Sequence, residues 1–284
     1  MHTHKPVVFL HFHKSGGTTM CELAVLNNET AANGGHNNCN LRGDNNWYQR
    51  PFYSKSCEAR KHEGDSHSFM GLERWLDRSL CVPELLYATV LRDPLHRAIS
   101  NLAYQHANAA KVADVHQMLR PDWGYFSDHD TKLIEFSTAT FDNFHVRTLA
   151  GPDVFMLPAG HVTKTHLEQA KERLRQFSIV IVLEEWKVHS SQLSSLLGWQ
   201  RLSVPCDQRS AFVEDWMFWN LCAHRSSTHW LAQLKLEDAR ADEYLTGEWS
   251  QRNALDFELY RFGRHVALNR TRELELRVNV TTFS

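Results

Sequence analysis

Short apolar runs separated by helix-compatible segments dominate the pattern of the chain. Residues 7–12 and 85–91 are apolar runs rich in β-forming residues, and residues 178–183 (SIVIVL) form a third. The third run has no polar interruption, which is typical of a parallel strand buried on both faces. The three runs therefore predict three strands.

Helical patterns fill the intervals between these runs. In residues 163–177, Leu167, Ala170, Leu174 and Phe177 recur at helical spacing. A helix is also expected directly after Asp93, because Asp is a good N-cap and the following Pro94 suits the first helical position. We expect that helix to span residues 94–111, and further helices at residues 18–26, 72–80, 141–149, 186–197 and 253–266.

This alternation of strands and helices predicts an α/β fold, with a P-loop-like, mostly parallel sheet flanked by helices. In such sheets, ligands bind at the carboxyl ends of the strands. The length of 284 residues suits a single domain over residues 1–284. Within it, we expect residues 1–5 to be flexible and the Asn- and Gly-rich residues 27–46 to form a long loop.

Composition and charge exclude several classes of protein. Apolar residues make up 42% and charged residues 23% of the chain, values that argue against disordered and fibrous proteins. The net charge of −2 gives no overall field that would attract nucleic acid. No apolar run approaches the roughly 20 residues that cross a bilayer, so we expect no membrane segment within this chain.

The six cysteines form no C-x-x-C pair, which makes zinc-binding and thioredoxin-like interpretations weak. Their even number is compatible with disulfides without demanding them. Sequons for N-glycosylation occur at Asn28, Asn269 and Asn279. Because such triplets often arise by chance, they favour a secretory compartment only modestly.

The first predicted strand leads into the segment HFHKSGGTT, which has the composition of an anion-binding loop. Gly16 and Gly17 let backbone N–H groups approach an anion closely, and the following helix adds the positive end of its dipole. Lys14 contributes an ammonium group, while Thr18 and Thr19 contribute hydroxyl donors. The lysine precedes the glycines, unlike in the Walker A pattern. The segment therefore predicts a phosphate site, with a lysine-bearing turn as the plainer alternative.

The second predicted strand ends in the segment LRDPLHRAIS. Arg92 at the strand end can bind a phosphate with two parallel hydrogen bonds, and Ser100 follows about two helical turns later. Because the carboxyl ends of parallel strands meet at one edge of a sheet, this segment is expected to approach the loop around Lys14. Taken alone, the segment is better explained as a capped helix with a structural Arg–Asp pair.

His67, in the segment SHSF, is a candidate general base, because histidine is the commonest base at neutral pH. In a chain with 18 histidines, a single one is more often structural or solvent-facing. The alternative bases are His11, Glu63 and Glu73.

Together these segments resemble the Golgi-type carbohydrate sulfotransferases, and most closely the heparan sulfate O-sulfotransferases. HFHKSGGTT resembles that family's 5'-phosphosulfate loop, TVLRDPLHRAISNL its 3'-phosphate motif, and SHSFMGLERW its base-bearing segment. The likeness continues in order through DNFHVRTLAG, LEQAKERLRQFSIVIVLEEW and NALDFELYRFGRHV. His13 departs from the family, where Gln or Pro is expected, and the basic residues that would hold a sulfated polysaccharide are not clustered.

The resemblance implies transfer of a sulfuryl group from 3'-phosphoadenosine-5'-phosphosulfate (PAPS) to a hydroxyl, which leaves 3',5'-ADP (PAP) and requires no metal. It implies that Lys14 and His67 are catalytic and that Arg92 and Ser100 bind the 3'-phosphate. It further implies that the 5'-phosphate is held by Lys14, Ser15, Gly16, Gly17, Thr18 and Thr19.

The implied acceptor is a hydroxyl-bearing molecule, in the first place a glycan. Polysaccharide, glycolipid, a small alcohol or phenol and protein tyrosine all remain open. The resemblance implies a Golgi location if a membrane anchor precedes this sequence, and otherwise a soluble cytoplasmic protein.

Two other functions fit parts of the pattern. A P-loop-like kinase or nucleotide hydrolase would need Mg²⁺ and an acidic residue after an apolar strand, for which Glu184 and Glu185 are weak candidates. A catalytically silent sulfotransferase-like protein would bind a glycan or a partner without turnover.

Overall fold

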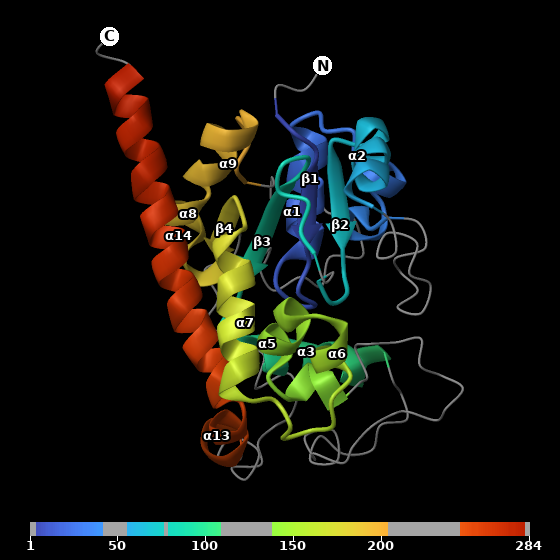
Figure 1. The fold of residues 1–284 in the computed structure, drawn as a ribbon, viewed down its shortest axis with the longest axis vertical. Coiled ribbons are helices and arrows are strands. Elements are labelled where there is room, and N and C mark those ends of the chain that lie inside the picture. The colour runs from blue at the N-terminus through green and yellow to red at the C-terminus, as the bar shows by residue number, and fades with distance from the viewer. Residues whose placement is uncertain (1–3, 42–55, 77–78, 109–137, 204–244, 282–284) are drawn as a thin grey trace.

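The computed structural model describes residues 4–41, 56–76, 79–108, 138–203 and 245–281. A four-stranded parallel sheet lies at its centre, in the order β2-β1-β3-β4 (Figure 1). The predicted α/β fold with a parallel sheet flanked by helices is therefore confirmed. The strands are β1 (Val7–Leu10), β2 (Phe69–Leu72), β3 (Leu86–Leu91) and β4 (Ile179–Val182).

Strand β1 pairs on both of its sides. Its first residue, Val7, lies opposite Phe69 of β2 and Leu86 of β3. The backbone N–H of His11 donates to the carbonyl of Leu72 at 2.9 Å, which extends the pairing with β2 one residue beyond β1. Since all three strands run in the same direction, their carboxyl ends lie at one edge of the sheet.

The helix expected at residues 72–80 was a wrong prediction. Leu72, its expected first residue, is the last residue of strand β2. The four residues of β2 are too few to display a period, yet all four are buried. Pairing with β1, a contact distant in sequence, thus decides their conformation rather than the local pattern. The described residues between β2 and β3 form no helix. A helix that the pattern did not predict, α2 (Cys57–Ser66), precedes β2.

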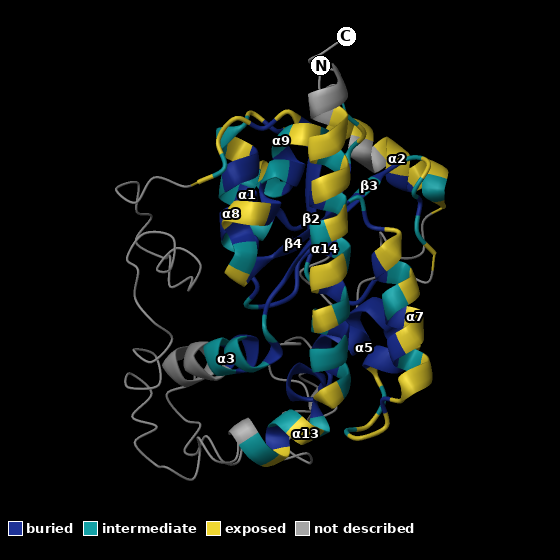
Figure 2. Cartoon of the chain, turned by 90° about the vertical axis from the view of Figure 1, so that its left-hand side faces the viewer, coloured by how far each residue is buried: buried dark blue, intermediate teal, exposed yellow. Residues whose placement is uncertain are grey.

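Helices cover both faces of the sheet, and the strands between them are buried (Figure 2). On one face, α1 and α9 pack against alternate residues of the strands, such as Phe9 and Val90. On the other face, α7 and α14 pack against the residues between these, such as Val8 and Val180. The described α-helices are α1 (Gly17–Leu26), α2, α3 (Pro94–Asn108), α5 (Phe144–Ala150), α6 (Pro152–Phe155), α7 (Lys164–Arg175), α8 (Trp186–His189), α9 (Ser191–Leu197), α13 (Ser250–Arg252) and α14 (Ala254–Thr281).

Short helical turns occur within the connecting segments. The expected long loop at residues 27–46 contains two of them and leaves the described part of the chain after residue 41. These turns are η1 (Ala32–Gly35), η2 (Asn37–Cys39), η4 (Thr138–Phe141), η5 (Leu183–Glu185) and the π-helical turn η6 (Leu245–Trp249).

Most expected helices exist with shifted ends. The helix that begins at Pro94 is described as far as Asn108, and the remaining expected residues, 109–111, lie outside the described part. The helix predicted at residues 186–197 is divided into α8 and α9. The helix predicted at residues 253–266 continues to Thr281. None of the helices in the described ranges has the length and apolar character needed to cross a membrane.

A buried carboxylate, Glu29, connects the residues that precede β1 and β2 to the segment that follows α9. It accepts hydrogen bonds from the ring of His4 at 3.0 Å, from the indole of Trp199 at 2.7 Å and from the hydroxyl of Ser68. Burial by itself raises the pKa of Glu29, but these hydrogen bonds outweigh it and lower the pKa. The hydrogen bond to Glu29 is also the main reason why the pKa of His4 is raised.

We expect this cluster to make folding stability depend on pH. Because the folded-state pKa of His4 is raised, its contribution is fully present below about pH 6.5 and is lost as the pH rises through the folded-state pKa. Glu29 has a lowered pKa, so its own contribution is lost only at acid pH. In denaturant titrations, His4→Gln should lower the free energy of unfolding at pH 5.5 but change it little at pH 9. The exposed His161→Gln serves as the control, and an equal effect of His4→Gln at both pH values would contradict the assignment.

Candidate functional site

The loop between β1 and α1 forms the centre of the candidate site. Ser15 N–H donates to the carbonyl of Phe12 at 2.9 Å, and Gly16, in the left-handed conformation at φ 83°, is the N-cap of α1. The helix starts at Gly17, and the N–H groups of a first helical turn lack partners within their helix. The buried hydroxyl of Ser15 has no hydrogen-bond partner within the described residues. Both features suit an anion, as the sequence predicts.

Lys14 connects this loop to the end of β3. Its φ of 66° lies in the left-handed region, which costs a side-chain-bearing residue roughly 1–2 kcal/mol. The buried Arg92, directly after β3, donates from Nη1 to the carbonyl of Lys14 at 2.7 Å. The predicted approach of the two strand ends is therefore confirmed. The charge-assisted hydrogen bond stabilises the unusual backbone of Lys14, a residue that is itself half-buried.

The second glycine of the loop makes room for a histidine. A Cβ atom on Gly17 would lie 2.1 Å from the ring of His11, so the imidazole packs directly on the loop backbone. His11 also stacks on Phe9, with ring centroids 5.9 Å apart. The sequence predicts Gly17 as a residue that lets an anion approach. In the structure, the side of Gly17 on which a Cβ would stand is already filled by the histidine.

Glu73, the first residue after β2, lies between two histidines of this loop. Its Oε1 is 2.9 Å from Nδ1 of His13, and its Oε2 is 3.3 Å from Nδ1 of His11. Burial by itself raises the pKa of Glu73, but the charges and hydrogen bonds of the two histidines outweigh it and hold the pKa well below its usual range. Glu73 is therefore an ionised carboxylate at neutral pH, with 17% of its side chain exposed.

Two asparagines from the turn η2 and the residue after it complete the surroundings of Glu73. Nδ2 of Asn40 donates to Oε2 of Glu73 at 2.9 Å, and Nδ2 of Asn38 donates to the same atom at 3.4 Å. The hydroxyl of Thr18 donates to Oδ1 of Asn38 at 2.8 Å. The proton of Thr18 is thus directed to a protein partner and not to a ligand.

The structure does not bring His67 to this site. His67 lies two residues before β2, whereas the loop follows the carboxyl end of β1, which runs parallel to β2. At about 3.3 Å per residue, the six residues from His67 to Glu73 span about 20 Å. Its position therefore argues against the predicted role as base. Of the alternatives, His11 and Glu73 lie at the site, and the side chain of Glu63 lies outside the described part.

Helix α3 begins as the sequence predicts. Oδ1 of Asp93 accepts the N–H groups of Leu95 at 3.0 Å and of His96 at 3.1 Å, so Asp93 caps the helix that starts at Pro94. Ser100 lies half-exposed on α3, eight residues after Arg92.

Arg97 is a buried cation near the site that sequence reasoning did not single out. Its guanidinium lies 4.5 Å from the ring centroid of Phe144, and its Nη2 donates to the carbonyl of Thr140. Burial lowers the pKa of Arg97 to about 9, and the carboxylate of Asp256 opposes this while the charge of Arg92 adds to it. Its Nε and Nη1 have no hydrogen-bond partner among the described residues. The sequence around Arg97 gives no signal that would distinguish a buried arginine from a solvent-exposed arginine on the same helix.

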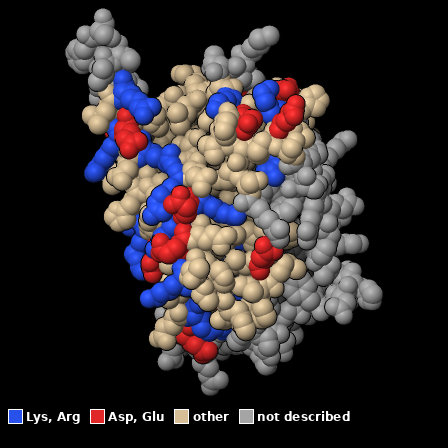
Figure 3. All heavy atoms as spheres, viewed as in Figure 1, with Lys and Arg blue, Asp and Glu red and all other residues tan. Residues whose placement is uncertain are grey.

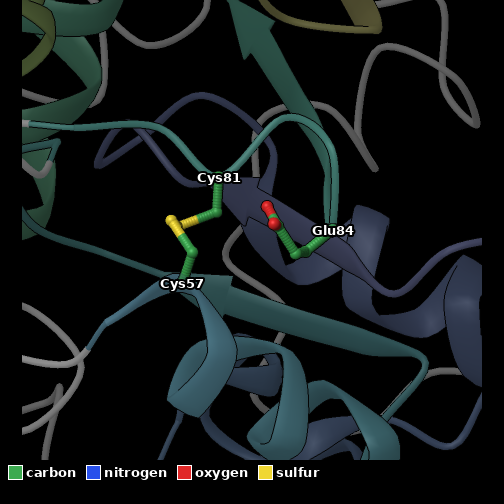
Figure 4. Close-up of side chains that lie close together, drawn as sticks. All are labelled: Cys57, Cys81 and Glu84. Carbon is green, nitrogen blue, oxygen red and sulfur yellow. A yellow bond between two sulfur atoms is a disulfide. The ribbon is translucent and has the colours of Figure 1, made fainter.

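One group of side chains in the described part has the composition of a metal site, but its sulfur atoms are already bonded. Cys57, Cys81 and Glu84 lie close together (Figure 4), and the two cysteines form a disulfide. A disulfide offers no thiolate to a metal. A second disulfide joins Cys21 of α1 to Cys39 of η2. The sequence left both pairings open.

Glu73 is the site residue that sequence reasoning ranked too low. Its signal was its place directly after a strand that pairs with β1, but Glu73 and the last residue of that strand, Leu72, were predicted to lie in a helix over residues 72–80. Once β2 is assigned, Glu73 must face the loop, because both follow parallel strands at the same edge of the sheet.

Comparison with known proteins agrees with this geometry. A model of the sulfotransferase family matches residues 1–263, which include all four strands, the loop around Lys14, Glu73 and Arg92. No curated protein matches the chain. Because the family match covers most of its length, the chain belongs to the sulfotransferase family.

Proposed function

We propose that this protein transfers the sulfuryl group of PAPS to a hydroxyl of a carbohydrate. The observation that carries the proposal is the contact between the two strand ends, in which Arg92 holds the backbone of Lys14 at the start of α1. A donor with phosphates at both ends needs two anion-binding segments close together. Family membership supports sulfuryl transfer as the reaction.

The loop residues would hold the 5'-phosphate of the donor. The N–H groups at the start of α1 and the unpartnered hydroxyl of Ser15 supply donors, and Lys14 supplies the positive charge. Negative charge builds on the leaving phosphate oxygen as its bond to sulfur breaks, and the ammonium of Lys14 stabilises it there. Arg92, together with Ser100, would bind the 3'-phosphate, although Arg92 also braces Lys14.

We assign the general base to Glu73 and not to His67. Glu73 is ionised, partly exposed and located at the carboxyl edge of the sheet beside the loop that carries Lys14. It would accept the proton of the acceptor hydroxyl while the oxygen of that hydroxyl bonds to sulfur and PAP leaves. His11 and His13 hold the carboxylate in position.

The carbohydrate acceptor and the Golgi location rest on the motif resemblance. Two disulfides support an oxidising compartment, because disulfides are rare in the cytosol. The visible charged face gives no preference for a polyanion. Lys and Arg side chains alternate with Asp and Glu along α7 and α14 (Figure 3), and several of them are paired, as in Lys171–Glu258 and Arg175–Glu172.

The nucleotide-kinase alternative loses support at its acidic residues. Glu184 accepts hydrogen bonds from the backbone N–H of Asp93 and from the hydroxyl of Tyr260, both at 2.9 Å. Glu185 pairs with Arg264 and His189. Both carboxylates are thus engaged in joining α8, α14 and the start of α3, and neither is left to hold Mg²⁺.

Donor binding is tested by thermal shift with PAP and with ATP·Mg²⁺. We expect PAP, but not ATP·Mg²⁺, to raise the Tm of the protein. Gly17→Ala should weaken the PAP-induced shift, because its Cβ displaces His11 from the loop. Gly247→Ala is the matched control, since a Cβ there meets no atom within 4 Å. A larger shift with ATP·Mg²⁺ than with PAP would overturn the donor assignment.

Loss of the Lys14 ammonium should reduce turnover more than binding. Lys14→Ala keeps a side-chain-bearing residue at the left-handed position, so it removes the charge without adding backbone strain. We expect kcat to fall by about 10²–10³-fold, as for loss of a group that stabilises developing negative charge. The rate is measured with labelled PAPS and a panel of acceptors, and the exposed Lys187→Ala is the control. An unchanged kcat would exclude Lys14 from the transition state.

One pair of variants distinguishes between Glu73 and His67 as the general base. Glu73→Gln should abolish transfer while PAP still stabilises the protein, because the amide cannot accept the proton. His67→Ala should retain turnover, since His67 lies at the opposite edge of the sheet. If His67→Ala is inactive and Glu73→Gln is active, the assignment reverses.

A further inference from the structure

Residues 38–40, here called the 38–40 segment, connect Glu73 to helix α1. We propose that the 38–40 segment is a positioning element of the active site, which holds the carboxylate of Glu73 in a fixed position beside the loop around Lys14. The segment is itself fixed to α1 by the Cys21–Cys39 disulfide. The inference rests on the proposed function, because it assigns the segment a role in that reaction.

The first observation is how the segment contacts Glu73. Asn40 is 4% exposed, and its Nδ2 donates to Oε2 of Glu73 at 2.9 Å. Asn38 donates to the same oxygen at 3.4 Å, while His13 binds the other oxygen at 2.9 Å. Contacts to both oxygens from two sides fix the plane of the carboxylate. Among the described residues, the titratable groups paired with this carboxylate are His11 and His13, and Asn38 and Asn40 contribute only amides.

The second observation is how the segment contacts α1. Oδ1 of Asn38 accepts the hydroxyl of Thr18 at 2.8 Å in the first turn of that helix. One turn further along, Cys21 is bonded to Cys39, which is completely buried. Because Cys39 lies between Asn38 and Asn40 in sequence, the disulfide fixes both asparagines to helix α1, which begins directly after the loop around Lys14.

The third observation is that the segment lies directly on β2. Asn40 forms a parallel bridge with Gly71, and Leu41 N–H donates to the carbonyl of Gly71 at 3.2 Å. A Cβ on Gly71 would stand 2.6 Å from the carbonyl oxygen of Asn38, so only glycine permits this contact. Asn38 and Cys39 have φ values of 56° and 57°, a strained pair of left-handed residues. Such a pair persists only where surrounding bonds fix it, as the disulfide does here.

A displacement of Glu73 of about 1 Å is sufficient to matter, because misplacement of that size can cost about 100-fold in rate. Hydrogen bonds from Asn38 and Asn40 prevent this displacement. Asn38 and Asn40 act on the reaction through the carboxylate of Glu73, so they are positioning residues and not catalytic ones.

Asn40→Asp is the primary test, since it preserves shape while replacing a donor with a second carboxylate. We expect kcat to fall by about 10–100-fold with little change in KM for PAPS. The like charge should also raise the pKa of Glu73, which moves the acid limb of the kcat–pH profile to higher pH. Asn33→Asp, in the same loop but without contact to Glu73, is the control. A purely structural role for Asn40 would lower the Tm without moving the pH profile.

The two disulfides supply a second, matched test. They close loops of similar length, with separations of 18 and 24 residues, so removal of either should reduce stability to a similar degree. Cys21→Ser/Cys39→Ser should lower kcat at least 10-fold at a temperature where the protein is folded. Cys57→Ser/Cys81→Ser should leave kcat within about 2-fold. Gly71→Ala, which pushes the segment away without changing a polar group, should behave like the first pair.

Two outcomes overturn the inference and can be told apart. If the wild-type protein binds PAP and turns over PAPS, but Asn40→Asp keeps the wild-type kcat and pH profile, the positioning role is wrong and the proposed function stands. If the wild-type protein consumes no PAPS with any acceptor, the proposed function fails and the role in the reaction fails with it. NMR titration of the Glu73 carboxyl in Asn40→Asp then still reports whether Asn40 holds that group, independently of turnover.

Discussion

Parallel pairing of β1 with both β2 and β3 is the constraint on which the site depends. The register places Val7 beside Phe69 and Leu86, and so brings three strand ends to one edge of the sheet. From these ends emerge the loop around Lys14, Glu73 and Arg92. If these strands were not neighbours in the sheet, the loop, Glu73 and Arg92 would each stand alone at the end of an apolar strand. The sheet therefore assembles the site, and the hydrogen bond from Arg92 to Lys14 completes it.

The polar groups at this edge stabilise one another because they are shielded from water. Glu73 would be costly to bury alone, but two histidines and two asparagines satisfy its oxygens and keep it ionised. Packing and chemistry are also linked at Gly17, where the absence of a Cβ admits the His11 ring.

Covalent bonds reinforce the elements around the site where the chain lacks regular structure. In its described part, residues 27–41, the Asn-rich segment after α1 has only short helical turns. The Cys21–Cys39 disulfide and the contact with Gly71 nevertheless fix residues 38–40 against α1 and β2. The Cys57–Cys81 disulfide similarly joins α2 to the segment before β3. Both disulfides agree with an oxidising compartment.

Apolar runs, caps and glycines are local signals, and from them the sequence predicts the α/β class, three of the four described strands, the Asp93 cap and the loop around Lys14. Its motifs indicate the sulfotransferase family. That residues 69–72 are a strand is visible only in the folded chain, since four residues carry no period and pairing with β1 determines their conformation. The pairing of β2 with β1 also places Glu73 beside the loop around Lys14 and His67 at the amino end of β2, away from that loop. The partners of Glu73 are more than 30 residues away in sequence, and no local pattern reports such contacts.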